Sequence, residues 1–143
     1  MWSPSAAALS DEPSSPTGPC ALVREERLLT TSRGHVVQAV RWALPAGVPL
    51  RAAVVFFHGN NSYMSGTHAG LAARLAPLGV QLFGYDQHSY GRSVGLPGDA
   101  DHGLLVGALQ ANVGSHEAMV GDAVDVAREV AAAVAGEIGR AHV

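Results

Sequence analysis

The sequence has one cysteine, little charge and no long apolar run, and each shortage excludes a class of protein. The single cysteine, Cys20, excludes an internal disulfide and any metal site built from several cysteines. No wholly apolar run is longer than that of residues 52–57, which is far too short to cross a bilayer, so we predict no transmembrane segment. Nine basic residues against twelve acidic ones give a net charge of −3. Without a basic surplus to neutralise phosphates, we predict no nucleic-acid partner.

The sequence does contain enough apolar side chain for a core. Its 143 residues are the size of one small domain, with 48% hydrophobic and 15% charged residues. Residues 1–20 differ, because four of the eight prolines and five serines fall there, so we predict a disordered tail. This tail lacks the basic start and apolar stretch of a signal peptide and the arginines of a transit peptide, so we expect a cytoplasmic protein.

The apolar pattern after this tail first predicts a hairpin and a buried strand. Residues 27–31 and 35–44 have strand composition and flank a turn in which Gly34 supplies a positive φ if one is needed. Residues 51–57 are almost continuously apolar. A strand that is apolar on both faces belongs in the middle of a sheet with helices on each side.

A helix and another strand follow. Leu71, Leu75 and Leu78 recur at helical spacing, so we predict a helix over 67–78 that buries these leucines. Residues 80–85 form the next apolar strand. Strand, helix and strand together predict a parallel βαβ unit, and hence an α/β fold.

A longer helix is predicted over 115–136. Ser115 is its candidate N-cap, and Val120, Val124, Ala127 and Ala131 form its expected buried stripe. In an α/β fold a strand normally follows such a helix, and none does.

The last seven residues, 137–143, reproduce one translated frame of a widely used sequencing adapter. We therefore predict that they are not native and that the natural protein continues beyond residue 136; the alternative is that they are the natural end of the helix. The predicted organisation is a tail (1–20), a partial α/β domain (21–136) and an adapter-derived end (137–143).

Two motifs follow the two predicted parallel strands. His58, Gly59 and Asn60 come directly after the first, where backbone N–H groups at the carboxyl edge of the sheet can bind a developing oxyanion. After the second comes Asp86-Gln-His-Ser-Tyr-Gly-Arg-Ser-Val-Gly95.

With these motifs, residues 51–98 resemble the amino-terminal half of an α/β-hydrolase of the serine aminopeptidase and monoacylglycerol-lipase (lysophospholipase) branch. In that family one strand ends in His-Gly-x and the next in Asp-x-x-Gly-x-Gly-x-Ser-x-Gly. The chain matches at Asp86, Gly91, Ser93 and Gly95 and departs from the pattern at Ser89, where the family usually has glycine.

The resemblance implies a truncated α/β-hydrolase sheet from a serine esterase or lipase, acting on a small acyl-ester or lipid-like substrate without a cofactor. Asn60 would donate an oxyanion-hole N–H, next to Gly59, and His58 would support the turn. The loop residues of the second motif would be structural: Asp86, Gly91, Ser93 and Gly95. The nucleophile, acid and histidine would lie beyond residue 136, so we assign no catalytic residue here and expect the chain to be inactive.

Ser93 also stands in a Gly-x-Ser-x-Gly pattern, but its surroundings argue against a nucleophile. A nucleophile elbow needs a strand directly before the serine and a helix directly after it. Residues 96–98, Leu-Pro-Gly, cannot comfortably begin a helix. Asp99, Asp101 and His102 complete a formal Ser-Asp-His order, but within one loop they have no scaffold to hold a triad.

The remaining motifs give little. The seven histidines are scattered without metal-ligand spacing, so we predict no metal site. No glycine-rich phosphate loop follows either strand. The alternative to a hydrolase fragment is a complete, non-catalytic α/β binding module.

Overall fold

The computed structural model of the chain describes residues 22–59, 64, 68–94, 96–100 and 115–141. The predicted tail at 1–20 therefore lies outside the described residues. In chain order the elements are β1 (Val23–Thr30), β2 (Val36–Ala43), β3 (Ala52–Phe57), α1 (Ala69–Leu75), the 3₁₀ helix η1 (Ala76–Leu78), β4 (Val80–Tyr85) and α3 (His116–Ala141).

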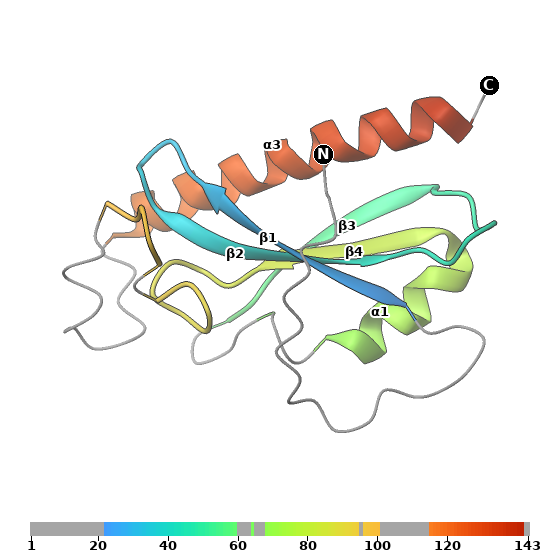
Figure 1. The fold of residues 1–143 in the computed structure, drawn as a ribbon, viewed down its shortest axis with the longest axis horizontal. Helices are drawn as coiled ribbons and strands as arrows, with labels where there is room; N and C mark the ends of the chain where they lie inside the picture. Colours follow the sequence, from blue (N-terminus) through green and yellow to red (C-terminus); the bar gives the residue numbers. More distant parts are fainter. Residues whose placement is uncertain (1–21, 60–63, 65–67, 95, 101–114, 142–143) are drawn as a thin grey trace.

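The strands form one mixed sheet in the order β1-β2-β4-β3 (Figure 1). β1 pairs with β2 and β2 with β4 in antiparallel fashion, whereas β3 and β4 are parallel. The predicted hairpin and parallel βαβ unit are both confirmed, but β3 lies at an edge of the described sheet and not in its middle. Because β3 and β4 are parallel and β2 runs opposite to β4, the carboxyl ends of β3 and β4 share one end of the sheet with the β1–β2 turn.

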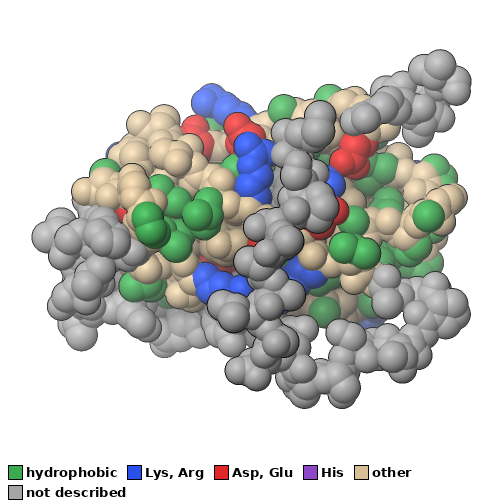
Figure 2. Space-filling model, viewed as in Figure 1, with side chains coloured by type: hydrophobic (Ala, Val, Ile, Leu, Met, Phe, Trp, Pro, Cys, Tyr) green, Lys and Arg blue, Asp and Glu red, His purple; other side chains and the backbone are tan. Residues whose placement is uncertain are grey.

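The hairpin is longer than the pattern predicted. β1 begins at Val23, four residues early, and pairs with β2 from Val23↔Ala43 to Thr30↔Val36. The first residues of β1 are mostly polar, so the apolar pattern did not indicate them as strand. Ion pairs stabilise them there: Arg24 pairs with Glu26, and Arg41 of β2 pairs with Glu25. In Figure 2, basic and acidic side chains lie together across the middle of the face that β1 crosses in Figure 1.

The two helices cover opposite faces of the sheet (Figure 1), so the core has two parts. Under α3, Val126 and Val130 pack on apolar side chains of three strands: Leu29, Val37, Ala39, Phe83 and Tyr85. Under α1, Ala72 packs on the other face with Val40, Trp42, Met64 and Leu82. Burial of apolar side chains on both faces stabilises an α/β layer arrangement.

The predicted helix over 67–78 is divided, and its leucine stripe is wrong. α1 ends at Leu75 and a 3₁₀ turn that contains Pro77 completes the segment. Leu71 and Leu78 are 37% and 61% exposed, whereas Ala72 and Ala76 are buried. The helix thus turns its small residues to the sheet, and of the three leucines only Leu75 packs against the core.

The predicted stripe of α3 is also wrong. Val120 and Val124 are 44% and 42% exposed, and Ala131 is exposed as well. The buried stripe contains Asp122, Val126 and Val130, with spacings of four residues. Apolar residues occur around much of this helix, so periodicity alone did not determine which side faces the sheet.

The ends of α3 differ in how well they were predicted. The Ala118 N–H donates to Ser115 Oγ at 3.1 Å, which confirms Ser115 as an N-cap. The helix then continues past Gly136 to Ala141, so its predicted end is wrong. Arg41 donates to Glu137 Oε1 at 2.7 Å.

No described helix is long and apolar enough to cross a membrane.

Candidate functional site

The carboxyl ends of β3 and β4 bring the two sequence motifs together. Phe57 and Tyr85 are the last paired residues of the two strands. His58 and Gly59 therefore leave the sheet beside Asp86 and the residues that follow it. Ligands of open α/β sheets bind at this end of the strands, and we take the site to be this edge.

His58 is held at both nitrogens of its ring. It is only 3% exposed, and its ring packs edge-on against Tyr90 with centroids 5.3 Å apart. The Gln87 N–H donates to Nε2 at 2.9 Å, and Nδ1 lies 2.9 Å from the Gly59 carbonyl oxygen. One partner is a donor and the other an acceptor, so both bonds require the neutral ring with its proton on Nδ1.

Gly59 presents its backbone to open space. It is exposed, and an added Cβ would meet no atom of the described residues within 4 Å. Packing against the described residues therefore does not require glycine here, and the missing side chain leaves the backbone accessible from their side. Asn60, the predicted oxyanion donor, lies outside the described residues.

Asp86 connects three segments, two through its carboxylate and one through its backbone N–H. It is fully buried. Oδ1 accepts the Met64 N–H at 2.6 Å, and Oδ2 accepts the Arg92 N–H at 2.8 Å. The Asp86 N–H donates to the Gln38 carbonyl on β2 at 2.9 Å. An ionised carboxylate that accepts backbone N–H groups fixes a turn strongly.

Ser93 is fully buried and uses its hydroxyl within the loop. Oγ donates to the Asp86 carbonyl at 2.5 Å and accepts the Gln38 N–H at 2.9 Å. The described residues before it form turns, not a strand, so the scaffold of a nucleophile elbow is absent at this serine. Gly91 takes a φ of 48°, and Gly95 lies outside the described residues.

Ser89 stands where the resembled pattern has glycine, and its backbone has a conformation that glycine adopts more easily than serine. Its φ is 70°, and it is the one non-glycine residue with positive φ among the described positions. A left-handed conformation costs an L-residue about 1–2 kcal/mol relative to the right-handed form. Ser89 is fully buried, and its N–H donates to the Ser93 carbonyl at 3.0 Å.

Two histidines and two aspartates form a buried cluster that the sequence did not predict. The rings of His35 and His88 stack in parallel, with centroids 3.7 Å apart. His35 Nδ1 lies 2.7 Å from Asp122 of α3, and His88 Nε2 lies 3.2 Å from Asp99, which also accepts the Val36 N–H. These contacts join β2, the loop after β4 and α3. No short motif connects residues so distant in sequence, so nothing in the pattern signalled them.

Asp99 is therefore engaged with His88, whereas Asp101 and His102 of the formal Ser-Asp-His order lie outside the described residues. Within the described ranges, no group of three or more His, Cys, Asp or Glu side chains could hold a metal ion. Burial, and then the charge of Asp122, raise the pKa of the Tyr85 phenol well above its usual value.

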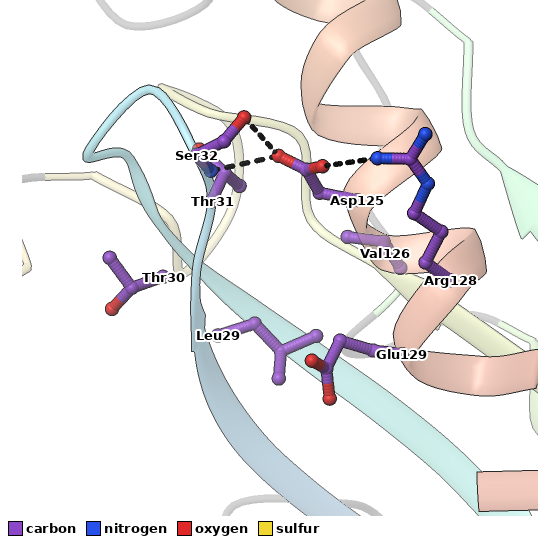
Figure 3. A pocket seen from close by; sticks show the side chains of 8 residues that line it. All are labelled: Leu29, Thr30, Thr31, Ser32, Asp125, Val126, Arg128 and Glu129. Carbon is purple, nitrogen blue, oxygen red and sulfur yellow. Dashed lines mark hydrogen bonds and ion pairs between the residues drawn. The ribbon is translucent and has the colours of Figure 1, made fainter. Parts of the chain in front are cut away.

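A small cavity of about 220 Å³ lies between the end of β1 and α3 (Figure 3). On its rim, Asp125 accepts the Ser32 hydroxyl at 2.7 Å and the Ser32 N–H at 2.8 Å. These hydrogen bonds lower the pKa of the Asp125 carboxyl. The cavity is separate from the His58–Gly59 turn. Its lining residues come from the end of β1, the turn after it and α3: Leu29, Thr30, Thr31, Ser32, Asp125, Val126, Arg128 and Glu129.

Comparisons with known proteins define the fold. No protein-family model matches the chain, and no curated protein matches it. Among solved structures, the chain is similar to a cold-adapted esterase from an Arctic intertidal metagenomic library, determined as a PEG-bound complex. The two share 19% sequence identity with a TM-score of 0.53, over 82% of this chain and 47% of the esterase chain. The chain therefore has the α/β fold of about half of that esterase.

Proposed function

We propose that the chain represents the amino-terminal half of a serine hydrolase of the esterase or lipase type. The position of His58 and Gly59 at the carboxyl end of β3, beside the Asp86 loop, carries this proposal. The similarity to half of an esterase supports it at the level of fold. The motif residues favour the serine aminopeptidase and monoacylglycerol-lipase branch, with a small acyl-ester or lipid-like substrate.

In this proposal the chain contributes part of an oxyanion hole. A serine supplied by a segment after residue 136 attacks the acyl carbonyl, and the Asn60 N–H helps to hold the oxyanion that develops. Gly59 leaves the approach open, since no described atom lies where its Cβ would be. With the nucleophile, acid and histidine supplied elsewhere, the chain alone should have no hydrolase activity.

The second motif has a structural role in this proposal. The Asp86 carboxylate and the Ser93 hydroxyl bond to backbone groups of the loop and of Gln38, so neither is free for chemistry. Gly91 supplies a positive φ, and we assign Gly95 to the same loop. The loop in turn supports the end of β3 through Gln87 and His58.

The first experiment is to sequence the genomic reading frame. We expect it to depart from residues 137–143 and to continue into a strand, a Gly-x-Ser-x-Gly elbow and a helix. A frame that ends near residue 136 would instead favour the non-catalytic binding module.

The longer protein then allows a test of the oxyanion donor. Asn60→Ala keeps the backbone N–H and should change ester hydrolysis little. Asn60→Pro removes that N–H and should lower kcat by roughly 100-fold or more, the scale for loss of one oxyanion donor. Small and equal effects of the two substitutions would argue against the oxyanion role.

A further inference from the structure

Gln87 donates two hydrogen bonds to His58, which join the ends of β4 and β3. The Gln87 backbone N–H donates to His58 Nε2 at 2.9 Å, and its side-chain amide donates to the His58 carbonyl oxygen at 2.5 Å. His58 is buried, so water competes weakly for these bonds. No sequence motif singles out Gln87, which directly follows Asp86.

The ring of His58 transmits this restraint to the next residue. With Nε2 occupied by a donor, the neutral ring carries its proton on Nδ1, and Nδ1 lies 2.9 Å from the Gly59 carbonyl oxygen. A peptide unit is planar, so a bond that holds a carbonyl oxygen also restrains the N–H that belongs to the same unit. The unit that begins at the Gly59 carbonyl contains the N–H of the proposed oxyanion donor.

We propose that Gln87 is a positioning residue, which locks His58 in the Nδ1–H tautomer and thereby orients the carbonyl group of the Gly59 peptide unit. The significance of this unit rests on the proposed function, but the lock itself does not. Catalytic oxyanion donors act without reorganisation only when their direction is fixed beforehand. Gln87 and His58 supply that restraint from buried neighbours on two adjacent strands.

The test reads the tautomer of His58 directly, in the full 143-residue chain labelled with ¹⁵N. Long-range ¹H–¹⁵N spectra at pH 8 should show a pyrrole-type Nδ1 and a pyridine-type Nε2 for His58. A His58→Gln variant assigns the signal by its loss, and His116→Gln at the start of α3 is the matched control that should leave it unchanged. A protonated Nε2 in the wild-type chain would overturn the proposal, whatever the variants do.

Two substitutions at Gln87 separate its bonds. Gln87→Leu keeps the backbone N–H and removes the amide donor, so the tautomer should persist while the His58 carbonyl ¹³C signal shifts. Gln87→Pro removes the N–H, and a population of the Nε2–H tautomer should appear. A folded Gln87→Pro chain with an unchanged tautomer would overturn the role of Gln87; if this variant does not fold, the wild-type spectrum still decides.

These outcomes are independent of catalysis. A locked tautomer together with a longer protein that tolerates Asn60→Pro would contradict the oxyanion role and leave the lock in place. A protonated Nε2 together with strong sensitivity to Asn60→Pro would contradict the lock and leave the proposed function in place.

Discussion

The Ser93 hydroxyl donates to the carbonyl oxygen of Asp86 at 2.5 Å across the turn that follows β4. The same oxygen atom of Ser93 accepts the Gln38 N–H from β2, so one buried hydroxyl satisfies two backbone groups of different segments. Ser93 therefore connects the loop after β4 to β2 of the sheet. This geometry also removes the hydroxyl from any surface at which a substrate could be attacked.

Replacing Ser93 with alanine should destabilise the protein. The buried carbonyl of Asp86 and the partly buried N–H of Gln38 would lose this partner, at a cost of about 1–3 kcal/mol for a buried group left unsatisfied. Ser32→Ala is the matched control, because the Ser32 hydroxyl bonds to Asp125 at the exposed surface, where water can replace it. Denaturant unfolding should show a larger loss of unfolding free energy for Ser93→Ala than for Ser32→Ala.

A fluorophosphonate probe should not label the wild-type chain. Since Ser93 is fully buried and its hydroxyl is engaged, it lacks the exposure that an activated nucleophile needs. Labelling of the wild type that disappears in Ser93→Ala would contradict our assignment of this serine.

Tyr85 should make the protein sensitive to alkali. Its pKa is raised in the folded state, first by burial and then by Asp122, whereas an unfolded tyrosine ionises near pH ~10. The unfolded chain therefore loses this proton first. The stabilising effect is complete below pH ~10 and is lost above it, by up to about 1.4 kcal/mol per pH unit. Between pH 8 and 11.5, the midpoint temperature of thermal unfolding should fall less steeply in Tyr85→Phe than in the wild type. Equal slopes would exclude Tyr85 as the source of the sensitivity to alkali.

The chain should self-associate through β3. Among the described strands β3 pairs with β4 alone, and Val54 and Phe57 are 40% and 46% exposed. An apolar strand with a free edge favours pairing with another chain. Val54→Lys should shift size-exclusion profiles toward the monomer. Leu28→Lys is the control, because β1 at the opposite edge already carries charged residues; a wild-type chain that stays monomeric at high concentration would contradict this expectation.

Removing residues 137–143 should cost little stability if they are not native. The deletion takes Glu137 from Arg41, but Arg41 keeps its ion pair with Glu25. Partly exposed ion pairs contribute roughly 0–1 kcal/mol, so denaturation curves of the truncated and full chains should nearly coincide. Glu137→Gln in the full chain isolates the ion pair from the rest of the segment. A loss of several kcal/mol on deletion would show that these residues belong to the fold.

The local sequence determined the strands and the turns. The apolar run at β3, the similar run at β4 and the glycine at position 34, with φ 81°, were sufficient because each depends on its own residues and near neighbours. The position of the two motifs at one end of the sheet followed as well, since parallel strands align their carboxyl ends.

Only the tertiary structure decided which sides of the helices are buried. α3 has apolar residues at helical spacing on more than one side, so Val124 and Val126 were equally plausible core residues from the pattern. The side that faces the sheet is the one from which Asp122 reaches His35, a contact between residues 87 positions apart. The link between Gln87 and His58 has the same origin. Both contacts join elements that are far apart in the sequence and come together only when the chain folds. Residue type and local spacing therefore cannot predict them.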